Sequence, residues 1–475
     1  MSNNVTQILE QTIFGELSTA EVTPIVQISA QYALEEGLNI ITSDAGSYVI
    51  EDSLYKVTSG TNPLGLSSLN TKRQATYRPG QGMIARGTAI FDNPVADTLQ
   101  AFGFITSEDS FGFGYLGESF GVLRATGGIV EAQELTITTP AGGAENATVT
   151  INGAGYTVPL TAGTVEHNAW EIAQSLSSQV ANFLFSSNED TVYCMAQVPG
   201  PNGAYAFTSA TAVAAFVQQA AGVDPTITVI EQSNWNVDTF SQLNPQTGNI
   251  YEIKFGYLGF SGIEFYVKNP ENNEKTLVHI LEYGNSETSP IVRNPTFRIG
   301  WIARNLGSTT GVTIQGASAM GAIEGKIIVG DSPRGLEAIQ LSVGSVQTNV
   351  LAVRNRFHAG DIINRATIKP LLLSFATSSN REAFFEITVN PTFGGDLDFS
   401  YVDKDNSIIE VATDAVTVSG GRFVAAFTVT SQGLVLSSSN FETRIEPDQI
   451  FSISAAVTSG AASDMVAAVS LLEDL

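Results

Sequence analysis

The sequence predicts a mainly β fold: a β-sandwich of jelly-roll type that carries a small inserted α+β domain, followed by a second β-sandwich. Three observations predict this class. Apolar and polar residues alternate with a period of two along many short runs, which is typical of half-buried strands. Turn-forming residues separate these runs at regular spacing, and glycine occurs 44 times in 475 residues. One stretch has apolar side chains at helical spacing.

The composition suits two or three domains whose surfaces contact other chains. Hydrophobic residues make up 43% of the chain and charged residues 15%, against about 25% charged residues in typical soluble domains. The formal net charge of −25 predicts repulsion from phosphate backbones, so we expect no direct nucleic-acid binding. We interpret the acidity as solubility in a crowded assembly or in salty water.

The single cysteine, Cys194, excludes an intramolecular disulfide and a cysteine-based metal site. It lies in an apolar run, residues 192–196, so we expect a buried structural thiol rather than a nucleophile. Residues 1–12 lack the basic and apolar segments of a signal peptide. No run approaches 18 apolar residues, so we expect no membrane span.

Residues 1–35 are predicted to form an N-terminal arm. Residues 5–9 and 25–34 have the character of short helices, separated by the polar and small residues 15–23. Such a segment has too little apolar surface to fold alone. Two interpretations stay open: a frayed terminus, or an anchor that becomes ordered against a neighbouring subunit.

Residues 36–133 and 233–330 are assigned to the first sandwich, which the insert splits. Its clearest part is the stretch 250–285, where three alternating runs and the turn residues 269–273 predict an antiparallel meander. Aromatic residues alternate with glycine in residues 111–115, so large rings can pack on one face while the other face is closely approached. The predicted strands of this sandwich are residues 48–51, 54–57, 80–91 (which opens with a glycine-rich turn), 99–105, 111–115, 120–124, 250–255, 263–267, 276–281, 296–303, 311–316 and 323–329.

Residues 134–232 differ in texture and are predicted to be a domain inserted into a surface loop of the sandwich. Six runs have strand character: residues 134–139, 147–151, 156–160, 192–198, 205–208 and 226–230. A helix is predicted over residues 165–185, with Thr164 as its N-terminal cap. Its apolar stripe consists of Ala169, Ile172, Ala173, Leu176, Val180, Phe183 and Leu184.

Residues 331–475 are predicted to form the second sandwich, after a linker at residues 331–335. Short strands separated by turn residues support this assignment. They are residues 371–375, 383–389, 397–402, 408–412, 423–429, 450–456 and 465–472.

Three passages carry a resemblance to known proteins. The first is residues 111–124, FGFGYLGESFGVLR. The second combines residues 257–259 with Val278, His279 and residues 283–286. The third comprises residues 294–296, Asn305 and residues 317–325.

In this order, the passages resemble strands of uncharacterised virion structural proteins from tailed bacteriophages and large DNA viruses of algae. The resemblance spans about residues 70–475, including the insert, and implies a particle-associated role. The first sandwich is also similar to laminin-G or concanavalin-like jelly rolls, which often bind glycans. The sequence contains no clear lectin calcium site.

Residue patterns typical of catalytic or metal sites are weak. The three histidines, His167, His279 and His358, form no metal-binding motif, and we expect His279 to be a satisfied strand residue. Residues 403–407 with Asp414 offer alternating oxygen ligands but lack the glycine and glutamate of a calcium loop, so an acidic hairpin turn is favoured. Asp396 and Asp398 could form a glycosidase-like pair, although a solvated turn is the favoured interpretation. We therefore predict no catalytic, cofactor-binding or metal residues.

The densest basic cluster comprises Arg354, Arg356, Arg365 and Lys369. One interpretation is a docking surface for an acidic patch on a neighbouring copy. The other is ordinary surface charge. We favour docking, since electrostatic complementarity fixes register at interfaces.

The leading hypothesis is a non-enzymatic virion structural protein, part of the capsid, a fibre or a tail. It would assemble through sheet faces and the N-terminal arm, as a homo-oligomer that we predict to be a trimer, and would contact other virion proteins. The alternative is an adhesin module that binds glycans or a receptor on a virion or cell surface. No cofactor and no membrane span are expected.

Overall fold

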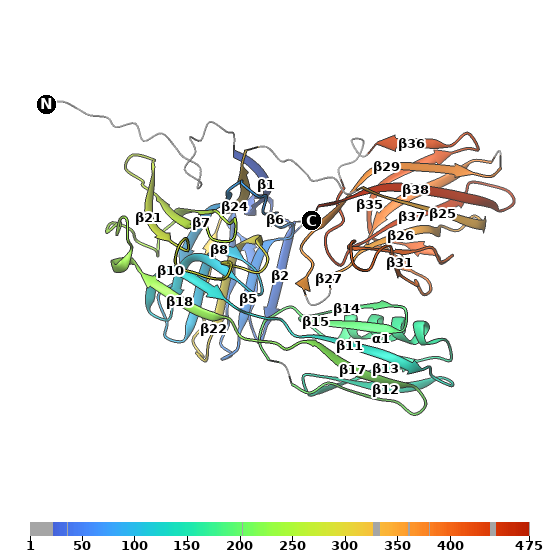
Figure 1. Cartoon of the computed structure of the whole chain (residues 1–475), viewed down its shortest axis with the longest axis horizontal. Coiled ribbons are helices and arrows are strands. Elements are labelled where there is room, and N and C mark those ends of the chain that lie inside the picture. The colour runs from blue at the N-terminus through green and yellow to red at the C-terminus, as the bar shows by residue number, and fades with distance from the viewer. Residues whose placement is uncertain are drawn as a thin grey trace. The chain divides into compact units, whose positions relative to one another are not determined.

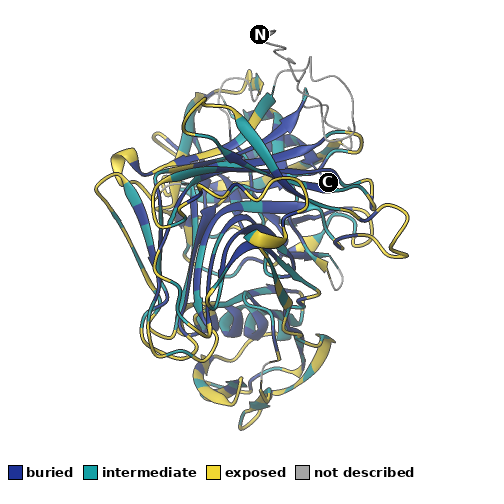
Figure 2. Cartoon of the chain, turned by 90° about the vertical axis from the view of Figure 1, so that its left-hand side faces the viewer, coloured by how far each residue is buried: buried dark blue, intermediate teal, exposed yellow. Residues whose placement is uncertain are grey.

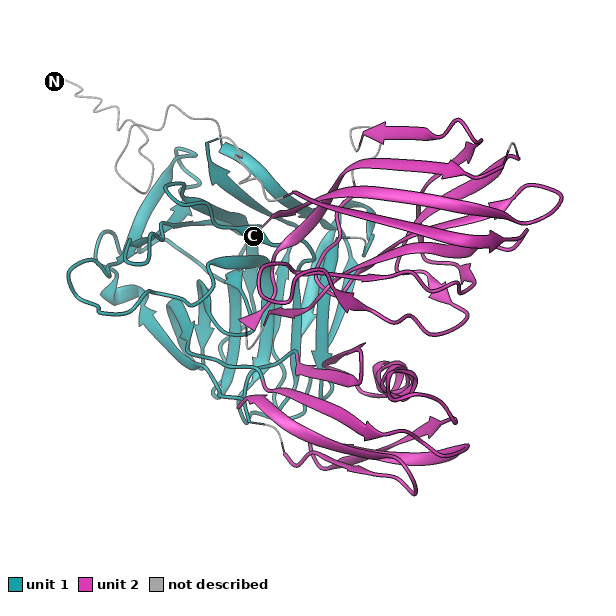
Figure 3. Cartoon of the chain, turned by 45° about the vertical axis from the view of Figure 1, so that its right-hand side comes forward, with its two compact units in different colours: residues 1–130, 197–201, 222–328 teal, residues 131–196, 202–221, 329–475 magenta. Residues whose placement is uncertain are grey.

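The computed structural model describes residues 22–35, 37–201, 203–325, 333–359, 362–379, 381–437 and 443–474. The chain divides into two compact units, coloured separately in Figure 3. Unit 1 comprises residues 1–130, 197–201 and 222–328; unit 2 comprises residues 131–196, 202–221 and 329–475. Among the described residues, strands dominate and α1 is the one α-helix (Figure 1). The predicted mainly β fold class is confirmed.

The described part of unit 1 is a sandwich of two antiparallel sheets. The nine-stranded sheet has the order β21 (Lys275–Leu281), β20 (Ile263–Lys268), β19 (Asn249–Phe255), β7 (Met83–Phe91), β23 (Thr313–Gly316), β4 (Leu54–Thr58) and β3 (Ser47–Glu51), with β24 (Ser318–Glu324) beside β7 and β1 (Val22–Ser29) beside β24. The eight-stranded sheet has the order β18 (Thr226–Glu231), β10 (Ser119–Thr126), β9 (Ser110–Leu116), β8 (Thr98–Ile105), β22 (Thr296–Asn305), β5 (Leu66–Thr71) and β2 (Leu38–Ser43), with β6 (Ala75–Thr76) beside β22.

Aromatic rings from both sheets form the core of unit 1. Phe113 of β9 lies 4.8 Å from Tyr251 of β19, centroid to centroid, and packs edge-on against Phe265 of β20. Such aromatic pairs add about 1 kcal/mol each beyond the area that they bury. A Cβ atom on Gly114 would lie 1.8 Å from the carbonyl oxygen of Gln100, so glycine is required where β9 approaches β8. In Figure 2 the interior strands are dark blue and the turns are largely yellow.

The predicted meander is confirmed. Strands β19, β20 and β21 pair in succession and antiparallel. In the turn between β20 and β21, the Asn269 carboxamide oxygen accepts a hydrogen bond from the backbone N–H of Glu271 at 2.9 Å. Asn273 adopts a φ of 63°, which asparagine tolerates.

The predicted helix at residues 25–34 is wrong, because these residues begin in strand β1. Val26 and Ile28 are buried in the core of unit 1, while Gln27 and Ser29 are exposed. Their β-branched side chains favour a strand. Pairing with β24 provides hydrogen-bond partners for the backbone of β1. Only a single 3₁₀ turn, Ala30–Tyr32, follows it. The other predicted helix, at residues 5–9, lies outside the described residues.

The first part of unit 2 is the inserted region. Its four-stranded sheet has the order β14 (Phe183–Asn188), β15 (Thr191–Ala196), β11 (Ala132–Thr139) and β17 (Val213–Ala220), and its three-stranded sheet has the order β13 (Ala154–Leu160), β12 (Glu145–Ile151) and β16 (Ala206–Thr208). Helix α1 (Val165–Gln179) packs Ala169, Ile172, Ala173 and Leu176 into the same core as these strands. The predicted cap is confirmed, since the Thr164 hydroxyl accepts a hydrogen bond from the backbone N–H of His167.

Two predictions for the inserted region are wrong: the end of its helix and the assignment of its last strand. The helix ends at Gln179 rather than at residue 185, because residues 183–188 pair with β15 as strand β14. Phe183 and Leu184 therefore belong to a strand, where tertiary pairing overrides a local helical pattern. The run at residues 226–230 is β18, which pairs with β10 in unit 1 and so belongs to the sandwich.

The second part of unit 2 is a sandwich formed by residues 333–474, as far as they are described. Its four-stranded sheet has the order β25 (Pro333–Val343), β38 (Ser463–Asp474), β29 (Thr367–Thr377) and β36 (Leu434–Ser437). Its six-stranded sheet has the order β32 (Ser400–Tyr401), β33 (Ile409–Ala412), β26 (Thr348–Asn355), β37 (Ile450–Val457), β30 (Ala383–Val389) and β35 (Arg422–Val429). Short pairs β27 (His358–Ala359) with β28 (Ile362–Ile363), and β31 (Thr392–Phe393) with β34 (Val418–Ser419), complete this part.

Side chains from both sheets of this second sandwich share one core, in which Phe375 and Phe385 lie 5.1 Å apart. Residues 331 and 332 of the predicted linker lie outside the described residues, while 333–335 begin β25. Among the described residues we find no helix whose length and apolar content would let it span a bilayer.

Candidate functional site

The predicted basic cluster lies in unit 2, but its arginines are not on the surface. Arg354, Arg356 and Arg365 are buried, whereas Lys369 of β29 is half-buried. The expectation of an exposed basic patch is therefore wrong for the three arginines. Docking of a neighbouring copy through Lys369 stays a prediction.

Arg354 of β26 joins the inserted region to the C-terminal sandwich. Its Nε donates a hydrogen bond to Glu410 Oε2 at 2.6 Å, and its Nη2 donates one to the carbonyl oxygen of Ser187 at 2.6 Å. The guanidinium lies 4.0 Å from the ring centroid of Phe399. The Asn188 amide donates to the other oxygen of Glu410 at 2.7 Å. The buried pair is thus a contact within one unit, formed by residues far apart in sequence.

A second group of contacts surrounds Tyr193 of β15. Its hydroxyl and the Tyr401 hydroxyl are 2.8 Å apart, and its ring lies 4.3 Å from the His358 ring. Arg356 lies over the Tyr401 ring at 5.2 Å and donates a hydrogen bond to the carbonyl oxygen of Lys404. Arg354 is therefore buried against β14 of the inserted region, and Arg356 is buried against Tyr401 and Lys404 of the C-terminal sandwich.

A cavity of about 280 Å³ lies between helix α1 and the segment that precedes β32. This volume is near the lower limit of the range for small-molecule sites, about 300 Å³. The lining combines aromatic rings with carboxylates: Thr164, Glu166, His167, Trp170, Ser187, Glu189, Asp396, Leu397, Asp398 and Phe399.

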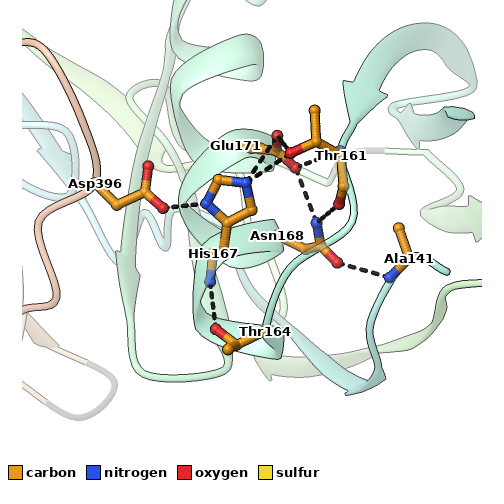
Figure 4. Close-up of polar contacts among 7 residues, drawn as sticks. All are labelled: Ala141, Thr161, Thr164, His167, Asn168, Glu171 and Asp396. Atoms are coloured by element: carbon orange, nitrogen blue, oxygen red, sulfur yellow. Dashed lines mark hydrogen bonds and ion pairs between the residues drawn. The ribbon is translucent and has the colours of Figure 1, made fainter. Parts of the chain in front are cut away.

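His167 is the one basic side chain in this lining, and helix α1 fixes its position (Figure 4). Its Nδ1 contacts Asp396, and its Nε2 lies 3.1 Å from Glu171 Oε1. Glu171 in turn accepts a hydrogen bond from the Thr161 hydroxyl at 2.6 Å. Partial burial opposes protonation of His167, but the hydrogen bond with Asp396 and the charge of Glu171 outweigh it, so the pKa of His167 is raised.

The carboxylates around the cavity differ in their surroundings. Partial burial, together with the charges of Asp414, Glu166 and Glu189, raises the pKa of Asp398. Within the described residues the Asp398 carboxylate has no hydrogen-bond or ion-pair partner, although its backbone N–H donates to Asp414. Hydrogen bonding at the helix cap, first to the Thr164 hydroxyl, lowers the pKa of Glu166. Both members of the predicted Asp396 and Asp398 pair therefore line the cavity, one bound to His167 and the other open to a ligand.

The acidic turn at residues 403–407 is held by its own hydrogen bonds. Asp403 Oδ1 accepts from the backbone N–H groups of Asp405 and Asn406, and strands β32 and β33 pair on either side of the turn. This confirms the predicted hairpin. Across the described ranges, no group of three or more acidic, histidine or cysteine side chains is placed to hold a metal ion.

The remaining candidates are buried in the fold. Cys194 is buried as predicted, and burial raises the pKa of its thiol. His279 lies in β21, where its Nδ1 accepts a hydrogen bond from the backbone N–H of Asn236 and burial lowers its pKa. His358 lies buried in β27.

Sequence reasoning missed Trp170, Glu189 and Phe399 as lining residues. The signal for Trp170 was present, since it lies one turn after Glu166 and off the apolar stripe of the helix. An indole outside the core often has a binding role. Glu189 and Phe399 have no such signal, because only the packing of two distant segments brings them together.

A separate surface feature of unit 2 is the outer face of its four-stranded sheet. Outward side chains are 64% exposed at Ile339, 67% at Leu341, 46% at Leu372 and 63% at Val435. The register places Val466 between Ile339 and Ala376, and places Ser374 between Ala468 and Val435. We call this set the apolar face: Ile339, Leu341, Leu372, Ser374, Ala376, Val435, Val466 and Ala468. Glu337 lies within it, and Lys369 pairs with Leu472 at one end.

Comparisons with known proteins give similarities of low identity. No protein-family model matches the chain, and no curated protein matches it. The metal-free carbohydrate recognition domain of Emp46p is 10% identical with a TM-score of 0.24, covering 62% of this chain and 90% of that one. A lectin from Bauhinia forficata, solved with GalNAc, is 8% identical with a TM-score of 0.24, covering 63% and 97%. The infectious bursal disease virus Gx strain structure is 10% identical with a TM-score of 0.12, covering 91% and 76%.

Proposed function

We propose that this chain is a non-enzymatic structural protein of a virion, located in the capsid, a fibre or a tail, and that it assembles with copies of itself and with other virion proteins. The observation that carries the proposal is the apolar face of unit 2. Four large aliphatic side chains stay exposed on one sheet, in a chain whose net charge of −25 favours solvated surfaces. Exposed apolar patches on soluble proteins mark interaction sites.

Two further observations support an assembly role. The charged fraction of 15% is low for a protein that keeps all of its surface in water, against about 25% in typical domains. The order of the strand motifs resembles that of virion components. An enzymatic role finds less support, because Asp396 is bound to His167, and the buried Arg354 and Glu410 hold the two parts of unit 2 together.

The proposal is tested by the mass of the purified full chain in solution and by its presence in particles. Size-exclusion chromatography with light scattering should show oligomers at micromolar concentration, and electron microscopy should show the chain incorporated into virions. A stable monomer that never joins particles would contradict the proposal. The predicted trimer is one outcome of the same measurement.

A second candidate function, binding of a glycan or receptor, is favoured by the cavity at helix α1. Trp170 and Phe399 offer apolar ring faces, and the open Asp398 carboxylate can accept hydrogen bonds from hydroxyl groups. A glycan array with and without calcium would test this function, with Trp170→Ala as the variant that should abolish any signal. Trp235→Ala would not serve as a control because Trp235 is buried in the core of unit 1. Silence of the array in both conditions would remove glycan binding.

A further inference from the structure

We infer that the cavity at helix α1 binds the ring of an amino sugar, and that the carboxylates of its lining hold the ammonium group of that sugar. This inference rests on the glycan-binding candidate and names the chemical class of its ligand. A buried hydroxyl without a partner, the charge of the lining and the position of one indole ring each support it.

Ser187 of β14 provides evidence for a ligand that does not depend on the acidic residues. It lines the cavity and is only 7% exposed. Alternation along β14 places its side chain on the same face as that of Phe185, which packs in one core with helix α1. Within the described ranges its hydroxyl has no hydrogen-bond partner. A buried hydroxyl of this kind destabilises the protein unless a ligand or a water molecule bonds to it.

The charge of the lining favours a cation. Of its four carboxylates, that of Asp396 is paired with His167, whose other ring nitrogen lies beside Glu171 (Figure 4). In the part of the chain that the structure describes, the other three form no ion pair: Glu166, Glu189 and Asp398. Partial burial and neighbouring negative charges raise the pKa of Asp398, and a bound cation would offset that repulsion. A hollow lined by one sign of charge concentrates ligands of the other sign.

Hydrogen-bonding capacity favours an ammonium group over a hydroxyl group. An ionised carboxylate only accepts hydrogen bonds, whereas an ammonium group has three donors and no acceptor. Each hydroxyl group of a neutral sugar has one donor, so its lone pairs would also face the carboxylates. Hydrogen bonds between two charged groups are shorter and stronger than those between neutral groups.

The apolar part of the lining favours a rigid ring over a flexible amine. Trp170 is half-buried and lines the cavity, so its indole can stack against the C–H face of a sugar ring. One face of Phe399 is already covered by the Arg354 guanidinium. The volume of about 280 Å³ suits one small group. A sugar ring loses less conformational freedom in such a space than the four-carbon stem of a lysine side chain.

The test is isothermal titration calorimetry of the full chain with D-glucosamine, at a pH where its amine is protonated. N-acetyl-D-glucosamine is the matched neutral ligand, because it has the same ring without the charge. We expect a dissociation constant of about 1 mM for D-glucosamine and one at least about tenfold higher for the neutral sugar. Tryptophan fluorescence should change on binding, and the change should come from Trp170, since Trp235 and Trp301 are buried in unit 1.

Two variants locate the bound ammonium group. Asp398→Asn should raise the dissociation constant of D-glucosamine at least about tenfold, because a charged acceptor is lost. Glu337→Gln is the matched control, since it also removes one carboxylate from unit 2 but lies on β25 and outside the cavity lining. It should change the dissociation constant less than about twofold. Circular dichroism and thermal melts establish that both variants fold.

Four results would overturn the inference: equal binding of the two sugars, equal or tighter binding of Nα-acetyl-L-lysine methylamide, equal effects of Asp398→Asn and Glu337→Gln, or no binding of D-glucosamine at about 10 mM. If N-acetyl-D-glucosamine binds as well as D-glucosamine, the glycan-binding candidate stands with a neutral ligand. If neither sugar binds and the glycan array is silent, that candidate fails together with the inference. The structural role does not depend on either result.

Discussion

Replacing Arg354 by methionine should separate the two parts of unit 2. The substitution removes the hydrogen bonds to Glu410 and to the carbonyl oxygen of Ser187, both 2.6 Å long, and the stacking over Phe399. Methionine fills similar volume but carries no charge. Glu410 then keeps the hydrogen bond from Asn188 and is left as a buried carboxylate without its guanidinium.

The magnitude follows from the groups that lose their partners. A hydrogen bond to a charged group contributes about 1.5–3 kcal/mol, and two are lost. Removing one member of a buried ion pair costs about 3–5 kcal/mol, because the other charge stays desolvated. We therefore expect the free energy of unfolding of unit 2 to fall by about 3–5 kcal/mol.

Hydrogen exchange with mass spectrometry measures this loss segment by segment. Peptides from β14, β15 and β26 should lose protection, while peptides from the core of unit 1 should keep it. Arg381→Met is the matched control, since Arg381 is exposed in the same unit and should cost less than about 0.5 kcal/mol.

The double variant Arg354→Met with Glu410→Leu distinguishes the effect of an unpaired buried charge from the effect of altered side-chain packing. Removing both charges should restore a large part of the lost stability, because an apolar pair of similar volume can replace a buried ion pair. Equal exchange in Arg354→Met and Arg381→Met would refute the reasoning, and so would a double variant no more stable than Arg354→Met.

Three further predictions concern single positions. His167→Gln should destabilise unit 2 more at about pH 6 than at about pH 8, because the raised pKa of His167 adds stability below its unfolded value that is lost as pH rises through the folded value; thermal melts that show a pH-independent difference would contradict this. Burial raises the pKa of Asp448 to about 7, so the stability that its protonated carboxyl contributes should be lost as the pH rises from about 4 to about 7. Asp448→Asn, which suits the left-handed backbone there, should be about 2 kcal/mol more stable than wild type at about pH 8 and equal to it at about pH 3, as measured by urea unfolding. Gly316→Ala places a Cβ 2.4 Å from the Trp301 ring and should cost about 1–3 kcal/mol, whereas Gly335→Ala meets open space; equal melting temperatures of the two variants would show that this reasoning is wrong.

Local sequence patterns predicted the elements in which buried and exposed residues alternate regularly. The alternation in residues 250–281 predicted three strands, and the asparagine-rich turn predicted where two of them reverse. Thr164 predicted the start of helix α1, because a hydroxyl cap acts on the backbone next to it in sequence. The regular spacing of turn residues between the alternating runs also predicted the mainly β class.

Contacts between distant segments decided what the local patterns could not. Residues 25–34 had helical character, yet pairing with β24 made Val22–Ser29 a strand. The four basic residues looked like a surface patch because a sequence shows charge but not burial.

The cavity is the clearest case of a feature that only the tertiary structure decided. Trp170 and Asp398 are 228 positions apart in the numbering, and no periodicity links them. The sequence by itself determined strands, turns and the helix cap, since these depend on near neighbours. The partner of each buried charge and the lining of the cavity depend on the packing of the inserted region against the C-terminal sandwich, because desolvation is a property of the fold.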